Sequence, residues 1–125
     1  MTTGNLTGPV IPVLRSFDEV LARSFYCDWL GFVIDWEHRF EPGLPLYAQF
    51  SRQGILLHLT GHHGDTTPGS SVRIGVEDVR AFAAELTERS SPFGKPHVEH
   101  MPWGLDEMRL TDPFSNRLTF YTPMT

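Results

Sequence analysis

Three of the chain's six histidines lie in one short stretch, HLTGHHGD (residues 58–65), which ends in an aspartate. Imidazole nitrogens and carboxylate oxygens are common metal ligands, so the stretch raises the question of a metal centre. His58 and His62 would stand roughly 13 Å apart on a continuing strand, too far to share one ion. If Gly61 turns the chain, the residues after it form a polar surface loop. We therefore predict no metal ion at this stretch.

A second pair of candidate ligands lies in HVEHM (97–101). His97 and Glu99 alternate onto one face of the predicted strand and could bind the same ion, but a third ligand is not evident. A non-standard site that combines them with His58 stays open. Cys27 lies in an apolar helical pattern and is predicted to be a buried, unreactive thiol. Because the sequence also has no HExxH, GxSxG or glycine-rich phosphate motif, we predict no catalytic residue.

Length and charge narrow the class of protein. The 125 residues suit one domain, spanning residues 1–125. The formal net charge of −5 argues against a nucleic-acid partner, which needs clustered Lys and Arg. No apolar run approaches a membrane span, so we expect no membrane partner. The N-terminal stretch MTTGNLTGP has no basic start and no apolar run, so we expect a cytoplasmic protein.

Hydrophobic periodicity predicts a strand, a helix and three strands, and then the same order again. In the first half the strands are 9–16, 32–40, 46–52 and 55–60, with a helix over 17–32. In the second half the strands are 71–76, 97–101, 106–112 and 116–122, with a helix over 77–89.

The two halves also resemble each other in sequence. FDEVLA (17–22) matches VEDVRA (76–81), with Val20 on Val79 and Ala22 on Ala81. An internal repeat indicates two similar structural units, here the βαβββ modules at about 9–60 and 71–122. We predict an α+β fold in which the modules form a curved mixed sheet, with the helices outside and a concave cleft.

Three stretches carry a resemblance to a known family: FYCDWLGFV (25–33), VRIGVEDV (72–79) and PWGLDEMRLTDPFSNRLTFY (102–121). The chain resembles the vicinal oxygen chelate superfamily, also called the glyoxalase/bleomycin-resistance/dihydroxybiphenyl-dioxygenase group, over nearly its whole length. Ser115 stands where the family's D-P-x-G-N pattern has glycine. The closest similarity is to the bleomycin-resistance proteins. These are described as homodimers that bind a cationic glycopeptide antibiotic in grooves at the dimer interface and leave it unmodified.

The resemblance also implies a role for the N-terminal segment. In bleomycin-resistance proteins the first strand commonly crosses to the other subunit and pivots near a proline. Pro9 and Pro12 are suitably placed for such a swapped arm. They fit a plain edge strand equally well, because proline cannot donate to a sheet ladder. We expect a homodimer and leave both arrangements of the first strand open.

The superfamily's enzymes hold a divalent metal with side chains from the first strand of each half and from the last strand. These positions correspond to Val10 or Ile11, to Ser71 and to Thr119. A divalent site needs about three ligands with lone pairs, which hydrocarbon side chains lack and hydroxyl side chains supply poorly. We therefore expect no metal, no other cofactor and a protein that binds rather than catalyses.

Candidate ligand-binding residues come from the resemblance and from strand alternation. The resemblance implies that Trp36 and Phe40 stack on the ligand and that Trp103 lines the groove that binds it. Asp35 and four further acids would attract the positively charged tail of the ligand. The four are Glu37, Glu41, Asp106 and Glu107. Alternation and hydrogen-bonding capacity complete the predicted site with His58, Thr60, Arg109, Thr119 and Tyr121.

The sequence supports one functional hypothesis best and leaves two others. The first is metal-independent binding and sequestration of a bleomycin-type glycopeptide antibiotic, or a similar planar cationic ligand, which confers resistance without modifying the drug. The second is a metal-dependent glyoxalase- or dioxygenase-type lyase, isomerase or oxygenase of the same superfamily. The third is a small accessory domain that binds a metabolite or another protein.

Overall fold

The structure is a computed structural model that describes residues 4–89 and 91–123. The first half contains β1 (Val13–Arg15), α1 (Glu19–Ala22), η1 (Arg23–Trp29), β2 (Val33–His38), β3 (Tyr47–Arg52) and β4 (Ile55–Thr60). The second half contains β5 (Ser71–Gly75), α2 (Val79–Glu88), β6 (Val98–His100), β7 (Leu105–Thr111) and β8 (Arg117–Pro123). The predicted α+β fold of two strand–helix–three-strand modules is thereby confirmed.

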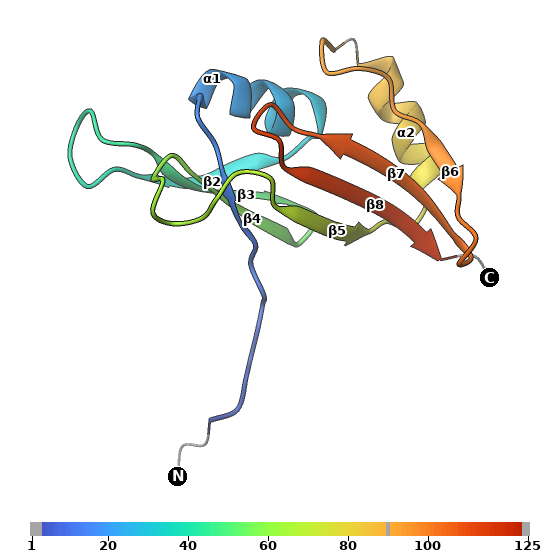
Figure 1. The fold of residues 1–125 in the computed structure, drawn as a ribbon, viewed down its shortest axis with the longest axis horizontal. Coiled ribbons are helices and arrows are strands. Elements are labelled where there is room, and N and C mark those ends of the chain that lie inside the picture. The colour runs from blue at the N-terminus through green and yellow to red at the C-terminus, as the bar shows by residue number, and fades with distance from the viewer. Residues whose placement is uncertain (1–3, 90, 124–125) are drawn as a thin grey trace.

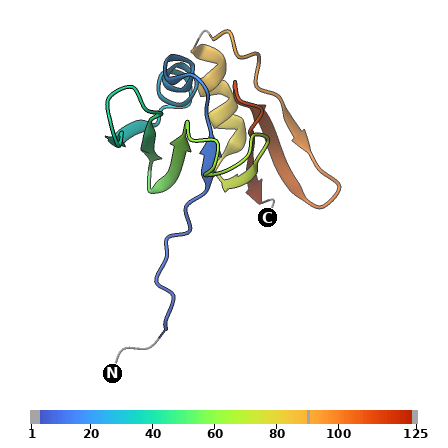
Figure 2. The same cartoon turned by 60° about the vertical axis from the view of Figure 1, so that its left-hand side comes forward.

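Each module forms its own four-stranded mixed sheet. The strand orders are β1-β4-β3-β2 and β5-β8-β7-β6, so the two sheets have equivalent topology. In each sheet the first strand pairs parallel with the last, and the remaining pairs are antiparallel. The helices lie on one side of the sheets, and the N-terminal segment leaves on the other side (Figures 1 and 2). No helix in the described part of the chain is long and apolar enough to cross a membrane.

The predicted first strand, 9–16, is much shorter in the structure. Only residues 13–15 pair in β1, and residues 4–12 form no strand or helix and extend away from the body of the chain (Figure 1). Pro12 lies at the end of this arm, where its carbonyl accepts a hydrogen bond from the His58 amide. Leu6 and Val10 are 99% and 93% exposed, so the arm's apolar side chains are in contact with water in a single chain.

Both helices begin at an aspartate that caps the first turn. Asp18 accepts from the Leu21 amide, and Asp78 accepts from the amides of Arg80 and Ala81. The equivalent residues of the two helices are therefore Asp18 and Asp78, one position away from the match indicated by FDEVLA and VEDVRA. The sequence match differs by one position because each helix start carries two adjacent acidic residues, Asp18 and Glu19 in one case and Glu77 and Asp78 in the other.

The predicted helix over 17–32 changes type along its length. After one α-helical turn, Arg23–Trp29 forms a π-helix, in which the Leu30 amide bonds to the Phe25 carbonyl five residues earlier. The apolar pattern does not distinguish the two helix types, since Phe25, Tyr26 and Trp29 face the core in either.

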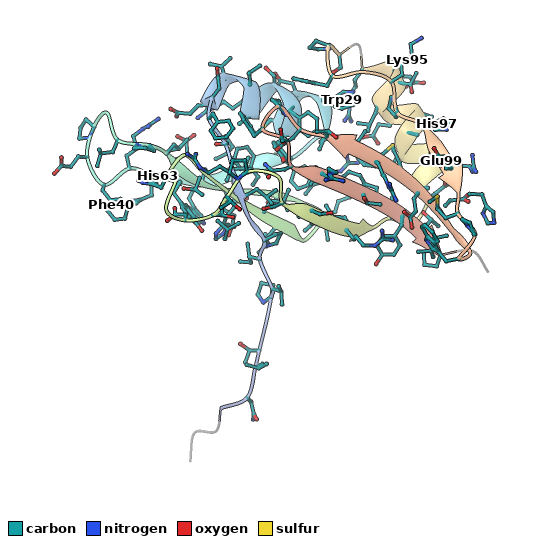
Figure 3. The ribbon with its side chains drawn as sticks, in the orientation of Figure 1. Trp29, Phe40, His63, Lys95, His97 and Glu99 are labelled. Carbon is teal, nitrogen blue, oxygen red and sulfur yellow. The ribbon has the colours of Figure 1, made fainter. Side chains whose placement is uncertain are left out.

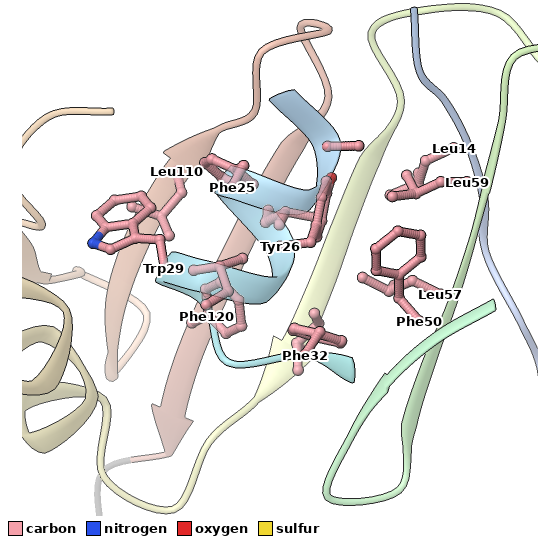
Figure 4. Packing of buried hydrophobic residues seen from close by; sticks show 14 of the residues in the cluster. Leu14, Phe25, Tyr26, Trp29, Phe32, Phe50, Leu57, Leu59, Leu110 and Phe120 are labelled. Atoms are coloured by element: carbon pink, nitrogen blue, oxygen red, sulfur yellow. The ribbon is translucent and has the colours of Figure 1, made fainter. Parts of the chain in front are cut away.

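Aromatic side chains dominate the core between the helices and the sheets (Figure 4). Phe25 packs edge-on against Tyr26, Trp29 and Phe93, with ring centroids 4.9, 5.5 and 5.2 Å apart. On the other side of the core, Leu14, Leu57, Leu59 and Phe50 come from the first sheet and are almost fully buried. Burying such side chains contributes about 1.5–3 kcal/mol each, so this core is the main source of stability.

A buried carboxylate joins the two modules. Asp112, in the turn between β7 and β8, is 4% exposed and accepts a 2.5 Å hydrogen bond from the Tyr26 hydroxyl in η1. Its oxygens also accept from the Asn116 side-chain amide at 2.8 Å and from the Phe114 and Asn116 backbone amides. Asn116 in turn donates to the Arg15 carbonyl in β1 at 2.8 Å. The network therefore ties one turn of the second module to both the helix and the first strand of the first module.

The same turn explains how Ser115 replaces the family's glycine. Ser115 has φ of 71°, in the left-handed region that glycine adopts most easily. A non-glycine residue there costs roughly 1–2 kcal/mol. The hydrogen bonds around Asp112 over-determine the turn and hold serine in this conformation.

We predict that Tyr26→Phe lowers the free energy of unfolding by about 1.5–3 kcal/mol, because it removes the neutral donor nearest a buried carboxylate. Urea denaturation would measure the change. Tyr121→Phe is the matched control, since no hydrogen bond of the Tyr121 hydroxyl is found in the described chain, and it should change stability by less than about 0.5 kcal/mol. Equal effects of the two substitutions would contradict the role assigned to the Asp112 network.

Candidate ligand-binding site

Each sheet has one face against the helices and one face that a single chain leaves uncovered. In β3, Ala48 and Phe50 are buried in the core, while Tyr47, Gln49 and Ser51 point to the uncovered face. In the second sheet, Phe120 packs on Phe82 of α2, so its neighbours Thr119 and Tyr121 point the other way. Residues on the two uncovered faces are therefore accessible to a ligand in a single chain.

A chain of hydrogen-bonded side chains crosses the uncovered face of the first sheet. The Tyr47 hydroxyl lies 2.7 Å from His58 Nδ1, and His58 Nε2 lies 3.0 Å from Gln49 Oε1. Gln49 Nε2 then donates to Asp35 Oδ2 at 2.9 Å. We call Asp35, Gln49, His58 and Tyr47, together with Trp36, the aromatic cluster.

The donor and acceptor of each of these hydrogen bonds can be assigned by starting from Asp35. The Asp35 carboxylate only accepts, which orients the Gln49 amide and leaves its oxygen facing His58. His58 therefore carries its proton on Nε2, and its bare Nδ1 accepts from Tyr47. Burial lowers the pKa of His58 below its ordinary value, and hydrogen bonds from Gln49 and Ser51 lower the pKa of Asp35. The cluster thus holds a neutral imidazole beside a charged carboxylate.

Trp36 forms the exposed surface of this cluster. Its ring is stacked on Tyr47 at a centroid distance of 5.9 Å and an interplanar angle of 5°. It meets the His58 ring edge-on at 5.2 Å. Trp36 is nevertheless 43% exposed, so a supported aromatic surface remains open to a flat ligand. Phe40 lies just beyond β2, is 72% exposed and packs edge-on against His38 and His62.

A second group of polar residues lies on the uncovered face of the second sheet. The Glu107 carboxylate accepts from the Trp103 indole at 2.7 Å and from Arg73 at 2.9 and 3.5 Å. These hydrogen bonds lower the pKa of Glu107. Arg73 also lies over the Tyr121 ring, 5.0 Å from its centroid. Glu107 is therefore a buried anchor that fixes Arg73 and the indole of Trp103.

In the second sheet two arginines flank one threonine on the neighbouring strands. Thr119 pairs with Arg73 on one side and with Arg109 on the other, so the three side chains stand side by side on β5, β8 and β7. We call these three residues the arginine rung. Thr119 is 6% exposed, whereas both arginines reach solvent.

The structure separates the predicted ligand-binding residues into two groups. Asp35, Trp36 and His58 meet in the aromatic cluster, with Phe40 nearby. Trp103, Arg109, Thr119 and Tyr121 lie on the second sheet. The two groups do not meet in one chain: Figure 3 shows Phe40 and His63 at one end of the molecule and His97 and Glu99, on β6 of the second sheet, at the other.

Thr60 lies apart from both groups. It is fully buried, and its hydroxyl donates to Asp65 at 2.7 Å across the turn that follows Gly61. Three of the acids expected to attract a cation are already paired: Glu37 with Arg23, Asp106 with Arg80 and Glu107 with Arg73. Asp106 also shares the α2 side of β7, away from the uncovered face.

Three residues of the two groups were not anticipated from the sequence: Tyr47, Gln49 and Arg73. Strand alternation was the available signal. It places Gln49 and Tyr47 on one face of LYAQFSR, and Arg73 on the polar face of SVRIGV. Alternation does not show which strands pair, and it is the pairing that decides which polar side chains lie next to an aromatic ring.

Comparison with known proteins agrees with this architecture. The model of the family described as "Glyoxalase superfamily protein" matches residues 3–124, so the chain belongs to the glyoxalase superfamily. A search of curated protein sequences finds no match.

Solved structures with similar folds include proteins that bind bleomycin. One is the bleomycin-binding protein from bleomycin-producing Streptomyces verticillus, complexed with copper(II)-bleomycin; it is 28% identical, with a TM-score of 0.69, over 98% of this chain and 100% of that one. Another is a bleomycin resistance determinant encoded on the transposon Tn5, 24% identical with a TM-score of 0.72, over 95% and 100% of the two chains. A third is a member of the glyoxalase/bleomycin resistance protein/dioxygenase superfamily from Sphaerobacter thermophilus, 22% identical with a TM-score of 0.68, over 93% and 98%.

The residues at the superfamily's metal-binding positions do not fit a divalent cation. Thr119 is paired with Arg73 on one neighbouring strand and with Arg109 on the other, and the positive charge of these two nearby residues repels such an ion. Ser71 offers only a hydroxyl, and Ile11 offers no lone pair. Within residues 4–89 and 91–123, no three His, Cys, Asp or Glu residues are grouped to hold a metal.

The proposed alternative set of metal ligands does not converge either. His58 is on the first sheet, with both ring nitrogens already hydrogen-bonded. His97 and Glu99 are 3.6 Å apart at the edge of the second sheet.

We predict that His58 titrates below the ordinary histidine pKa of about 6.5, and that Tyr47→Phe raises this pKa by removing a donor to the neutral ring. As the pH falls, His58 is therefore protonated in the unfolded chain at a higher pH than in the folded chain. The stabilising contribution of neutral His58 is therefore complete above about pH 6.5 and is lost as the pH falls toward the folded pKa. NMR titration of the imidazole signals would measure both values. A midpoint at or above 6.5 in the unaltered chain would contradict the assigned bonds.

Proposed function

We propose that this protein binds and sequesters a bleomycin-type glycopeptide antibiotic, or a similar planar ligand, without metal and without modifying it. The observation that carries the proposal is the aromatic cluster: a half-exposed Trp36 supported from below by Tyr47 and His58 on an uncovered sheet face. Stacking on such a surface contributes about 0.5–1.5 kcal/mol beyond the burial of area. The bleomycin-binding relative at 28% identity supports the same class of ligand.

The proposal includes a homodimer. The aromatic cluster and the arginine rung lie on different sheets, and each sheet has a face that one chain leaves open. A second copy could place the second sheet of one chain opposite the first sheet of the other and enclose a ligand between them. Enclosure matters because tight small-molecule sites bury most of the ligand's surface.

The N-terminal arm is the segment that would hold the two copies together. Residues 4–12 extend from the same side of the chain as the uncovered faces (Figure 2). Nine extended residues span about 30 Å, enough to reach a neighbouring chain. Their exposed apolar side chains, Leu6 and Val10, would lose contact with water there. We keep the cytoplasmic location as part of the proposal.

The metal-dependent alternative finds no support in the residues described. The cations around Thr119 and the separation of His58 from His97 both oppose it. We therefore do not propose an enzymatic activity.

Calorimetric titration of chelator-treated protein with metal-free bleomycin tests the proposal. We expect a dissociation constant tighter than about 1 µM at roughly one drug per chain. Trp36→Ala should weaken binding by about 2- to 30-fold, because it removes the stacking surface. Val20→Ala is the control, since Val20 is a 73% exposed apolar residue on α1, away from the uncovered faces. Absence of saturable heat would reject bleomycin as the ligand.

We further predict that removing residues 1–10 converts a dimer into a monomer, as measured by sedimentation. This truncation keeps Pro12, whose carbonyl bonds to the His58 amide, so β1 should stay in place. The double substitution Leu6→Ser, Val10→Ser keeps the arm's length but removes its apolar contacts, and should weaken the dimer too. A truncated chain that sediments as the full chain does would show that the arm plays no part in association.

A further inference from the structure

The uncovered face of the second sheet is basic. Arg73, Arg109 and Arg117 all point to it from adjacent strands, because residues that differ by two along a strand share a face. Arg73 is paired with Glu107. Arg109 and Arg117 make no ion pair with any residue in 4–89 or 91–123. The charge of Arg109 acts on Glu107 only at longer range, where it helps to lower the pKa of that carboxyl group. Neither Arg109 nor Arg117 therefore has a carboxylate at ion-pair distance in the described chain.

The arginine rung is geometrically suited to one small anion. Neighbouring strands lie about 4.8 Å apart, so the Arg73 and Arg109 backbones are separated by roughly 10 Å, with Thr119 between them. The Arg73 guanidinium lies toward Tyr121, where Glu107 holds it, and the Arg109 side chain is long enough to reach an anion bound beside it. The Thr119 hydroxyl makes no hydrogen bond within the described chain and can donate to an oxygen held there.

Arg73 is pre-positioned for this task. Its guanidinium is fixed by two contacts with Glu107 and by its place over the Tyr121 ring. Glu107 is itself held by Trp103 and has a side chain only 1% exposed, so it orients Arg73 and offers little negative charge to the solvent. A fixed guanidinium loses little entropy when it binds an anion.

Aromatic rings border the same place. Tyr121 follows Thr119 on the same face of β8, and Trp103 is 57% exposed beside Glu107. A ligand that placed an oxyanion on the rung would therefore lay its adjoining ring system near these side chains. The guanidinium fork matches the two coplanar oxygens of a carboxylate.

We infer that the arginine rung binds the carboxylate of an aromatic ligand, through Arg73, Arg109 and Thr119. The inference deepens the proposed function and rests on it for the small, ring-bearing nature of the ligand. It adds the charge that such a ligand presents to the second sheet. It also gives Thr119 a function in ligand binding. At this position the superfamily's enzymes carry a metal ligand, whereas here the anion would be bound directly by arginine side chains.

The test uses 2-naphthoate as the probe and its uncharged analogue 2-naphthamide as the reference, titrated into the full chain by NMR. We expect naphthoate to bind with a dissociation constant of roughly 1 mM or tighter and to shift the Trp103 indole signal. Naphthamide should bind at least about tenfold more weakly, as hydrogen bonds to a charged group are the stronger ones.

Matched variants separate a site from a general charge effect. Arg109→Gln should weaken naphthoate binding about tenfold or more, and Arg109→Lys should restore part of it. Arg80→Gln removes the same charge, but from the α2 side, where Arg80 pairs with Asp106, and should leave binding unchanged. Thr119→Val serves as a second variant if Arg109→Gln alters the circular dichroism spectrum, and it should also weaken binding because it removes the hydroxyl donor of the rung.

Two results would overturn the inference: equal binding of naphthoate and naphthamide, or equal losses in Arg109→Gln and Arg80→Gln. The bleomycin titration distinguishes this failure from failure of the proposed function. Bleomycin binding without selective naphthoate binding would reject the carboxylate site alone. Selective naphthoate binding without bleomycin binding would reject bleomycin and keep the site.

Discussion

The Asp112 carboxylate is the constraint on which the arrangement of the two modules depends. It is buried without a cation, so it must be satisfied by hydrogen-bond donors, and these come from both halves of the chain. Burial and the nearby Asp112 carboxylate raise the pKa of Tyr26 well above its ordinary value, which keeps the phenol protonated and able to donate. A shift of either module would leave a charged group unsatisfied. The network therefore favours one relative position of the helix, the first strand and the β7–β8 turn.

This fixed arrangement determines what a ligand meets. Both sheets turn their polar faces away from the helices, so one chain presents an aromatic surface around Trp36 and a cationic surface around Thr119. The two surfaces differ in chemistry although the modules repeat the same topology. The repeat supplies two equivalent scaffolds, and the side chains on their open faces have diverged. Such a pair of surfaces is suited to a ligand with chemically different ends.

Much of the fold could be predicted from periodicity. The residues 55–60 were predicted as a strand and form β4 over the same range, and the helix predicted over 77–89 forms as Val79–Glu88. The predictions failed where tertiary contacts outweigh local pattern. Residues 9–12 read as strand but have no partner strand in one chain, and residues 23–29 form a π-helix because the core accepts their aromatic side chains in that geometry.

The sequence by itself determined the repeated order of elements, the family resemblance and the residue types at the expected metal-ligand positions (Val10 or Ile11, Ser71 and Thr119), because these follow from residue type and local spacing. Only the tertiary structure decided which polar residues stand together. Trp36 and Trp103 both looked like parts of one site, yet they lie on different sheets, since strand pairing brings residues together without regard to their distance in sequence. The same pairing set Arg73 and Arg109 on either side of Thr119, a juxtaposition that arises from three separate segments of the chain.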